Sequence, residues 1–282
     1  MSENEDIDIL LITYNRPIYT RLTLERLFAT CDQTMRMWIW HNGNDQQTLE
    51  VVRSMLNHPR LYKFHHSLEN KIRIEPINWL WSNSEGQYLS VIDDDCLMPY
   101  GWAQKLRQAH QDVPEFGVIA CWHFQPEDFR YDLSRKKIKQ FSRGHQLLQN
   151  LWVQGSGVMM KRKCLETGGL LKPNEGHPGY CHKLAESGWV NGWYYPLIYM
   201  EHMDDPRSPH SLLRTDEDFK RYIPFSAKNN NVKTLAQWQT QLKRSAIIVQ
   251  KASLNPRHYR GWRRRLRTAF RATKVLLGLP GR

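Results

Sequence analysis

Paired cysteines are missing from this sequence. Its five cysteines are odd in number, and no two of them are separated by only two residues. This scatter excludes a disulfide framework and a cysteine-based zinc site, because both need paired spacings. At 282 residues the chain is long enough to bury a full apolar core without cross-links. We therefore expect a protein of the reducing cytoplasm.

Long apolar runs are missing as well. No stretch of the sequence approaches the ~20 apolar residues that a membrane-spanning helix needs. The first six residues hold three acidic side chains and do not resemble the basic start of a secretory signal. Neither a transmembrane helix nor a signal peptide is therefore predicted.

Acidic residues are missing from the end of the chain. The last one is Asp218, and residues 219–282 hold 16 Lys and Arg. The preceding part holds the other 24 basic side chains against 28 acidic ones, so the net charge of +12 belongs to the tail. The composition predicts a mildly acidic body with a strongly basic C-terminal stretch.

Three consecutive aspartates, Asp93, Asp94 and Asp95, are the most informative feature that is present. They follow residues 87–92, whose pattern predicts a strand, and strand ends are where α/β enzymes place their chemistry. Carboxylates this close repel one another unless a cation lies between them, and oxygen ligands favour Mg²⁺ or Mn²⁺. The alternative is an acidic turn, because Asp also favours turns and helix N-caps.

Apolar periodicity in the first half alternates between the strand and the helix patterns. The predicted strands are 7–12, 35–40, 61–65 and 87–92, and the predicted helices are 17–30, 44–57, 75–84 and 99–111. Repeated β-α units imply a mainly parallel, doubly wound sheet. The turns 13–16, 41–43 and 93–95 should then meet in one crevice at the carboxyl ends of the strands.

The second half has no clear β-α alternation. Strands are predicted over 116–124, 151–160 and 189–200, with a polar loop over 125–146, and a helix is predicted over 231–249. We expect one catalytic domain over residues 1–226, with a nucleotide-binding half to about residue 112 and an acceptor half to residue 226. Residues 227–282 would form a helical extension.

The order of these motifs resembles glycosyltransferase family 2, the inverting nucleotide-sugar transferases of the GT-A fold. Residues 9–17 resemble the first strand and nucleotide-binding turn of that family, and residues 38–44 resemble its second strand and turn. Asn70 and Asn78 have the spacing of a later asparagine segment, and residues 86–88 lead into the three aspartates as expected. The resemblance implies a Rossmann-like, mainly parallel sheet flanked by helices, with a mixed acceptor-side half and C-terminal helices.

The resemblance also implies a site. The side chains expected at the nucleotide-sugar are Thr13, Tyr14, Asn15, Arg16, His41, Asn42, Asn78, Asp93, Asp94 and Gly155. Asp93, Asp95 and His202 are expected to hold Mn²⁺ or Mg²⁺, and the Asp204-Asp205 pair offers alternative ligands. A bound divalent ion would stabilise the charge that develops on the leaving nucleotide diphosphate, for which a uridine diphosphate sugar is the commonest source in the family.

The general base is the weakest part of the resemblance. An inverting enzyme needs a group that takes the proton of the acceptor hydroxyl, and in the family this is a carboxylate. Its Glu-Asp pair falls here on Gly176 and His177. Glu175, one step away, is the first candidate, and His177 is the second, because an imidazole near its ordinary pKa of ~6.5 accepts a proton.

The basic tail has two stripes if residues 257–279 are drawn as a helix. One is apolar and contains Trp262, Leu266 and Phe270, and the other contains Arg260, Arg264, Arg267, Arg271 and Lys274. Such a helix favours the surface of an anionic membrane. The alternatives are a helix packed on the catalytic body and a nucleic-acid contact. We expect a cytoplasmic enzyme, peripheral on the inner face of the cell membrane, whose acceptor is a glycan or lipid-linked saccharide of bacterial-type surface polysaccharide assembly.

Two other functions compete with this interpretation. A sugar-1-phosphate nucleotidyltransferase would need a Gly-rich phosphate loop after the first strand, which residues 13–17 do not provide. A nucleic-acid-binding protein could use the basic tail. That function leaves Asp93, Asp94 and Asp95 unexplained, since acidic groups repel phosphate, and no nucleic-acid partner is expected.

Overall fold

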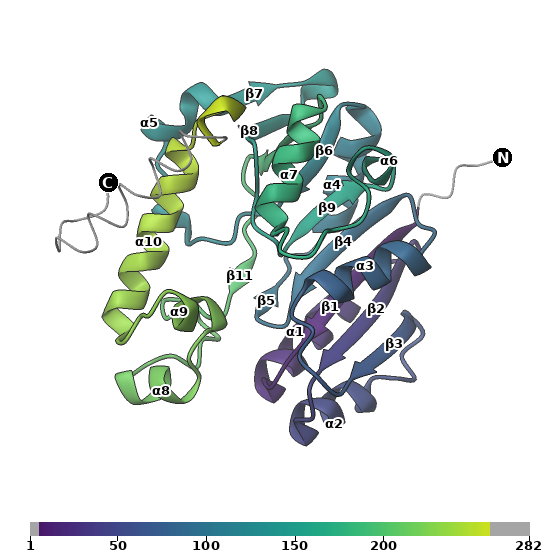
Figure 1. The fold of residues 1–282 in the computed structure, drawn as a ribbon, viewed down its shortest axis with the longest axis vertical. Helices are drawn as coiled ribbons and strands as arrows, with labels where there is room; N and C mark the ends of the chain where they lie inside the picture. The colour runs from purple at the N-terminus through teal and green to yellow at the C-terminus, as the bar shows by residue number, and fades with distance from the viewer. Residues whose placement is uncertain (1–5, 260–282) are drawn as a thin grey trace.

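A nine-stranded sheet forms the centre of the molecule (Figure 1), with the strand order β3-β2-β1-β4-β9-β6-β10-β8-β7. The computed structural model describes residues 6–259. Its strands are β1 Ile7–Thr13, β2 Met35–Asn42, β3 Leu61–Ser67, β4 Tyr88–Asp93, β5 Cys96–Leu97, β6 Phe116–Ala120, β7 Ile138–Gln140, β8 Gln146–Asn150, β9 Val158–Lys161, β10 Val190–Tyr195 and β11 Glu201–His202. β5 and β11 form a second, two-stranded sheet.

Helices follow most of the strands. The α-helices are α1 Pro17–Thr30, α2 Gln46–Ser54, α3 Ile74–Asn83, α4 Trp102–Asp112, α5 Tyr131–Ser134, α6 Cys164–Gly168, α7 His177–Glu186, α8 Asp216–Arg221, α9 Phe225–Asn229 and α10 Leu235–Lys251. The short 3₁₀ helices are η1 Pro126–Asp128, η2 Arg135–Lys137, η3 Ser142–Gly144 and η4 Pro256–Tyr259. The α/β class expected from the sequence is confirmed.

The first half is built of β-α units, as predicted. β1 pairs in parallel with β2 and with β4, and β2 pairs in parallel with β3. Every predicted end of these strands and of α1 to α4 lies within three residues of the observed one. The pattern succeeds best for β1, β2 and β4, which are buried on both faces; all seven residues of β1, for example, are buried.

The second half corrects several predictions. Residues 151–157 are not part of a strand; β8 ends at Asn150 and β9 begins at Val158. The amide of Gly157, which has a φ of 67°, bonds to Val91 O instead, so this segment turns across the end of β4. β6 and β10 are shorter than predicted, and the expected loop over 125–146 contains η1, α5, η2, β7 and η3. Elements this short carry little periodicity in the sequence.

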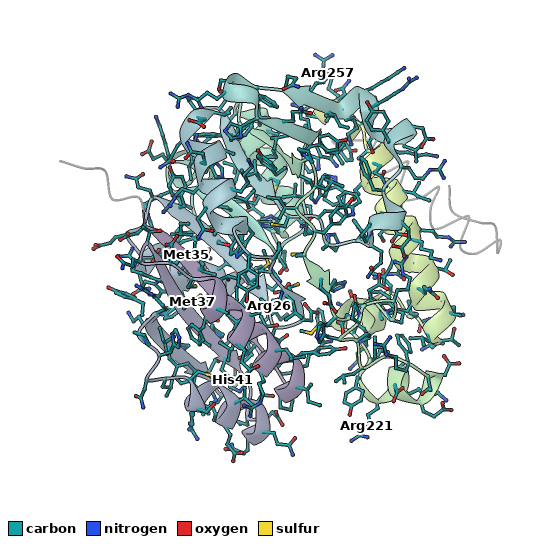
Figure 2. The ribbon with its side chains drawn as sticks, turned by 180° about the vertical axis from the view of Figure 1, so that it is seen from behind. Arg26, Met35, Met37, His41, Arg221 and Arg257 are labelled. Atoms are coloured by element: carbon teal, nitrogen blue, oxygen red, sulfur yellow. The ribbon has the colours of Figure 1, made fainter. Side chains whose placement is uncertain are left out.

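Two apolar layers cover the two faces of the large sheet. On one face α1, α2 and α4 pack through side chains such as Leu27, Val52 and Leu106. On the other, α3, α7 and α10 pack through side chains such as Leu80, Leu184 and Ala246. Figure 2, seen from behind, shows α1 in front of the strands, with Arg26 and Met37 labelled. The carboxyl edge of the parallel strands stays open for a site.

The helix α10 is fastened to the body by Gln250. Its side-chain amide donates to Asp128 O at 2.9 Å, and its carbonyl oxygen accepts from Arg130 N at 2.6 Å. The predicted helix over 231–249 is thus observed four residues later at its start and two at its end. Of the amphipathic helix predicted over 257–279, all but the first three residues lie outside the described part of the chain. Within residues 6–259, no helix has the length and apolarity to cross a membrane.

Candidate active site

The turns after β1, β2 and β4 meet at the carboxyl edge of the sheet. β1 aligns Thr13 with His41 of β2 and Ile12 with Asp93 of β4, so the parallel pairing itself brings the three turns together. The amide of Tyr14 donates to Asp94 Oδ2 at 2.8 Å, across 80 positions of sequence. The crevice expected from the sequence is present in this geometry.

Asp94 connects the turn after β4 to the turn after β1 and to α1. Its carboxylate is buried and also accepts the Thr20 hydroxyl at 3.2 Å, while its carbonyl oxygen accepts the Thr23 hydroxyl at 2.9 Å. Burial raises the pKa of Asp94 to about 8, although the charge of Arg16 acts in the opposite direction. These contacts indicate a structural task for Asp94 at the base of the crevice.

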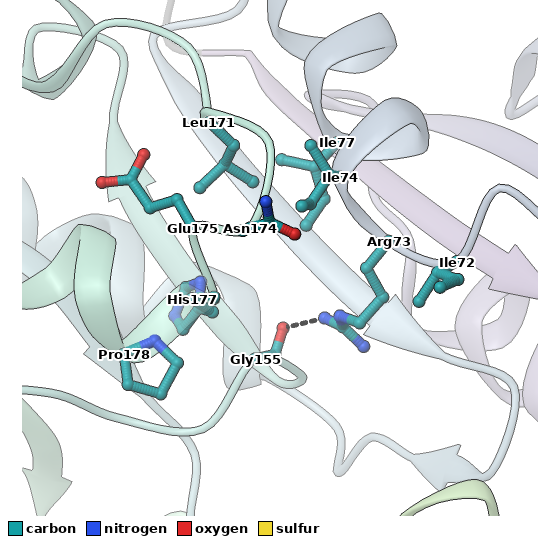
Figure 3. A pocket seen from close by; sticks show the side chains of 11 residues that line it. Ile72, Arg73, Ile74, Ile77, Gly155, Leu171, Asn174, Glu175, His177 and Pro178 are labelled. Carbon is teal, nitrogen blue, oxygen red and sulfur yellow. Dashed lines mark hydrogen bonds between the residues drawn. The ribbon is translucent and has the colours of Figure 1, made fainter.

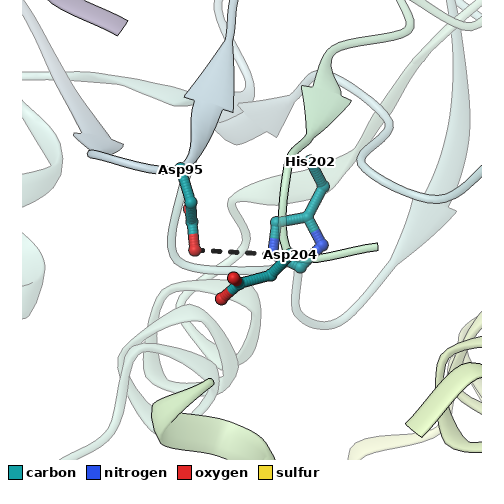
Figure 4. Close-up of side chains that lie close together, drawn as sticks. All are labelled: Asp95, His202 and Asp204. Carbon is teal, nitrogen blue, oxygen red and sulfur yellow. Dashed lines mark ion pairs between the residues drawn. The ribbon is translucent and has the colours of Figure 1, made fainter. Parts of the chain in front are cut away.

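The two-stranded sheet brings two distant segments to the three aspartates. β5 follows the aspartates directly and pairs antiparallel with β11, opposing Cys96 to His202. Met203 N donates to Asp95 O at 2.7 Å and fixes the register. As a result, one ligand atom each of Asp95, His202 and Asp204 lie within 4.8 Å of one another (Figure 4). We call these three residues the Asp95 cluster.

The charges of the Asp95 cluster are strongly coupled. Burial disfavours a charged His202, but the hydrogen bond and charge of Asp95 prevail and raise the pKa of His202 to about 9. Burial opposes the charge of Asp95 too, and His202 and Arg16 nevertheless hold the pKa of that carboxyl far below its usual range. Burial and the neighbouring Asp95 raise the pKa of Asp204 to about 6.

Arg16 is the cation that joins the cluster in this structure. Its Nη1 lies 2.8 Å from Asp204 Oδ2 and 3.1 Å from Asp95 Oδ2. The residue is positioned by the start of α1, and its guanidinium lies 5.6 Å from the centre of the Tyr19 ring. The side chain is 22 % exposed, which leaves it accessible from the crevice.

The donor set of the Asp95 cluster suits a divalent cation. Asp204 Oδ1 and His202 Nδ1 are buried, and neither has a hydrogen-bond partner among residues 6–259. Most buried polar atoms in proteins have a hydrogen-bond partner, so two unpaired atoms in one cluster call for an explanation. Two carboxylates and an imidazole are ligands that Mn²⁺ accepts readily, and Mg²⁺ takes the same oxygens.

Asp93 lies outside the cluster. Its carboxylate forms an ion pair with Arg73, the residue that precedes α3, and Arg73 Nη2 also donates to Gly155 O. The amide of Asp93 donates to the Ser156 hydroxyl at 2.9 Å. Asp204, rather than Asp93, is the third member of the Asp95 cluster, and Asp93 joins β4 to the loop before β9.

A cavity of about 490 Å³ opens beside Arg73 (Figure 3). We call it the Arg73 pocket. One wall comes from the connection into α3, and the other comes from the loop before α7. Most of its side chains are apolar, namely Ile72, Ile74, Ile77, Leu171 and Pro178, and the polar lining consists of Arg73, Asn174, Glu175 and His177.

The two candidate bases differ in their contacts. Glu175 accepts from Lys172 N at 3.0 Å and pairs with Lys183 Nζ at 3.2 Å. Figure 3 shows its carboxylate on the side away from Arg73. His177, the first residue of α7, has the Cys181 thiol 3.4 Å from its Nε2. Burial, and next the charge of Arg73, lowers the pKa of His177 to about 3, so its ring is neutral at pH 7.

Several expected nucleotide contacts are instead committed within the protein. Thr13 Oγ1 and His41 Nδ1 lie 2.8 Å apart, and both residues are buried. Burial, with a smaller effect of His66, lowers the pKa of His41 to about 4. Tyr14 and Asn15 are the exposed residues of the first turn.

Two asparagines that were expected at the nucleotide-sugar form hydrogen bonds with backbone groups. Asn42 donates to Ile72 O at 3.2 Å and accepts from Lys71 N at 3.0 Å. Asn78 makes a reciprocal pair with the backbone of Leu171, at 2.9 Å in each direction. Both amides thus shape the walls of the Arg73 pocket rather than face its interior.

Sequence reasoning missed Arg73. Its partners, Asp93 and Gly155, are 20 and 82 positions away, and no local pattern marks the residue. Gly155 was the available signal: a Cβ there would lie 2.8 Å from Arg73 Nη2, so a glycine allows the guanidinium to approach the backbone this closely.

Comparisons with known proteins agree with this geometry. The family model described as glycosyl transferase family 2 matches residues 8–169, more than half of the chain. No curated protein gives a significant sequence match.

Solved structures share the fold. The mannosyltransferase PcManGT from Pyrobaculum calidifontis, in complex with GDP-Man and Mn²⁺, has a TM-score of 0.57 at 16 % identity, covering 95 % of this chain and 80 % of that one. TarS residues 1–349 of S. aureus, in complex with UDP-GlcNAc, has a TM-score of 0.52 at 16 % identity, covering 90 % and 69 %. In complex with UDP it has a TM-score of 0.53 at 12 % identity, covering 87 % and 89 %.

Proposed function

The chain belongs to glycosyl transferase family 2, and we propose that this glycosyltransferase moves a sugar from a nucleotide diphosphate to a hydroxyl of a saccharide acceptor, with a divalent cation bound. The Asp95 cluster is the observation that supports the proposal. It gathers two carboxylates and an imidazole, with two orphaned buried atoms, at the edge where α/β sheets bind ligands.

The Asp95 cluster and the residues around it would bind different parts of the nucleotide-sugar donor. Asp95, His202 and Asp204 would hold Mn²⁺ or Mg²⁺, and that ion supplies positive charge against the departing diphosphate. Tyr14 and Asn15 face solvent from the first turn and would contact the nucleoside. Arg16 pairs with Asp95 and Asp204 through Nη1 and would bind a phosphate oxygen with its other N–H groups.

The Arg73 pocket would then receive the sugar and the attacking group. The acceptor hydroxyl attacks the anomeric carbon as the bond from that carbon to the diphosphate oxygen breaks, which inverts the configuration. The hydroxyl proton passes to His177, whose neutral ring has a lone pair to accept it. An anionic diphosphate near Arg73 would weaken the electrostatic effect that lowers the pKa of His177. Glu175, the first candidate from the sequence, becomes the second candidate in this proposal, because its carboxylate pairs with Lys183 and would have to be released first.

A transfer assay tests the proposal. Purified protein is incubated with uridine and guanosine diphosphate sugars and simple saccharide acceptors, with Mn²⁺ or with a chelator, and the release of nucleoside diphosphate is measured. We expect release from at least one donor, dependent on Mn²⁺ or Mg²⁺. Absence of release with every donor, while the protein stays folded, would contradict the assignment.

The acceptor is proposed to be a lipid-linked saccharide at an anionic membrane surface. The support is the basic stripe of residues 257–279 in the sequence, because each basic residue near such a surface contributes about 1 kcal/mol. Replacing Arg260, Arg264, Arg267, Arg271 and Lys274 together with Gln should abolish flotation with anionic vesicles at physiological salt. Undiminished flotation of that variant would contradict this role of the tail.

A further inference from the structure

The Arg73 pocket has an unusual residue on its rim. Ile72 has a backbone φ of 55°, a region that a β-branched side chain enters only at a cost in strain. Its side chain is nonetheless 55 % exposed and lines the cavity. An exposed isoleucine gains little from burial that would offset such strain, so the conformation needs a cause outside the side chain.

Two asparagine side chains impose that conformation. Asn70 Oδ1 accepts the amide of Ile72 at 2.9 Å, and Asn42 Nδ2 donates to its carbonyl oxygen at 3.2 Å. Both the N–H and the carbonyl group of Ile72 are thereby hydrogen-bonded. The same turn positions Arg73. Strained residues that are fixed in this way concentrate at ligand-binding sites.

The remaining lining limits what the pocket can bind. Arg73 offers only N–H donors, and both nearby carboxylates are committed, Asp93 to Arg73 and Glu175 to Lys183. Asn174 faces the cavity (Figure 3) and offers one carbonyl oxygen and one amino group. Sugar hydroxyls each carry a donor hydrogen, so a sugar with many free hydroxyls would leave several of them unpaired against isoleucine, leucine and proline.

We propose that Ile72 is a specificity-determining residue, and that the Arg73 pocket selects a nucleotide donor whose sugar carries an acylamino group. The methyl of that group would lie against Ile72 and the neighbouring isoleucines. Its carbonyl oxygen matches the donors of Arg73, and its N–H matches the carbonyl oxygen of Asn174. Arg73, which lines the pocket, pairs with Asp93, and Asp93 lies two positions before Asp95 in the chain. The sugar attached to a diphosphate at the Asp95 cluster is therefore the expected occupant.

This inference rests on the proposed function and is tested with donors that differ in one group. Uridine diphosphate N-acetylglucosamine is compared with uridine diphosphate glucose by kcat/KM for nucleoside diphosphate release. A missing apolar group in a fitted pocket lowers kcat/KM by roughly 10-fold or more, so we expect at least that preference for the N-acetyl donor.

Variants of Ile72 test whether this residue causes the preference for the N-acetyl donor. Ile72→Asn suits the positive φ but removes the apolar surface, and should cut the preference below about 3-fold without lowering the melting temperature. Ile72→Val keeps the apolar surface and should retain the preference. Leu68→Asn makes the matched change at a 69 % exposed leucine outside the pocket and should leave the donor preference unaltered.

Three results would overturn the inference. Equal or better use of the glucose donor contradicts the acylamino assignment while leaving the transferase function intact. An unchanged preference in Ile72→Asn contradicts the role of Ile72, and a change confined to the KM of the acceptor contradicts the assignment to the donor. If neither uridine diphosphate donor is used or bound but a guanosine diphosphate sugar is, this inference fails and the proposed function stands; if no donor of either kind is used, both fail.

Discussion

The Asp95 cluster and the Arg73 pocket are linked through Asp93, but they are built in different ways. The cluster lies on strand ends fixed by sheet pairing, and its side chains are only 14 %, 17 % and 5 % exposed. The pocket is formed by two connections, around residues 72–74 and 171–178, held by single asparagine amides and by one arginine. On the proposed function, the charged chemistry would lie on the strand ends and the selectivity for the sugar on the loops.

This contrast leads to different mutational outcomes in the two regions. Substitutions in the cluster should reduce turnover for every donor, because the diphosphate is common to all of them. Substitutions in the pocket should change which sugar or acceptor is used. The predictions below are ordered from the largest expected effect to the smallest.

Asp95→Asn should have the largest effect. It removes the charge that links His202 and Arg16, so we expect kcat/KM to fall by about 10⁴-fold, or about 5.4 kcal/mol. Mn²⁺ affinity, measured by electron paramagnetic resonance, should fall with it. Asp132→Asn, at an exposed carboxylate paired only with Arg130, is the matched control and should retain both. A variant that loses activity but keeps its Mn²⁺ affinity would argue against Asp95 as a ligand.

His177→Gln and Glu175→Gln separate the two candidate bases. Loss of a general base costs about 10²–10⁴-fold, and we expect that loss in kcat of His177→Gln. Glu175→Gln should lose less than about 10-fold, because its carboxylate is turned toward Lys183. Nucleotide-sugar affinity should remain in both variants. The reverse order of the two losses would restore Glu175 as the base.

His110 provides a structural reference outside both regions. It is buried, and burial lowers its pKa to about 3, while an unfolded chain would titrate near 6.5. Below pH 6.5 the unfolded state therefore binds a proton at His110 that the folded state does not bind. As a result, the free energy of unfolding falls as the pH falls toward 3. By linkage, the free energy of unfolding is about 2 kcal/mol lower at pH 5 than at pH 7 because of this group.

His110→Gln should remove that component of the pH dependence. Urea unfolding at pH 7 and at pH 5 measures it as the difference between the variant and the unchanged protein. Parallel pH profiles for the two proteins would contradict the assignment to His110.

Gly155→Ala should have the smallest effect. The added Cβ would lie 2.8 Å from Arg73 Nη2, the end of a flexible side chain, which can move away. We expect a loss of stability below about 1 kcal/mol but a weakening of donor binding by about 3- to 10-fold, since Arg73 leaves its place in the pocket. Gly179→Ala, at a residue outside the pocket lining whose Cβ would meet nothing closer than 3.8 Å, is the control for calorimetric binding. Equal affinities of the two variants would separate Arg73 from donor binding.

The same contrast explains what the sequence could predict. The strand β1 is a nearly continuous apolar run, and α1 begins at Pro17, a residue that favours the first position of a helix, so their ends were predicted closely. The carboxyl edge followed from topology alone, and Asp95 and His202 were expected to meet there. Asp204 had been considered only as an alternative ligand.

The pocket could not be predicted in the same way. Its walls depend on side-chain to backbone bonds between distant segments, such as those of Asn78 with Leu171, which leave no local pattern. The strand predicted over 151–160 failed for a related reason. Trp152, Val153 and Val158 are apolar enough for a strand, but Gly157 turns the chain onto Val91 of β4.

Thermal unfolding with uridine and guanosine diphosphates, with and without Mn²⁺, tests the central claim most directly. Ligand at 100 times its Kd stabilises a protein by about 2.7 kcal/mol, which corresponds to roughly 5–10 °C for a chain of this size. We expect such a shift for at least one nucleotide when Mn²⁺ is present, a much smaller shift with chelator, and no Mn²⁺ dependence in Asp95→Asn. No metal-dependent shift with either nucleotide would contradict a cation-assisted diphosphate site at the Asp95 cluster.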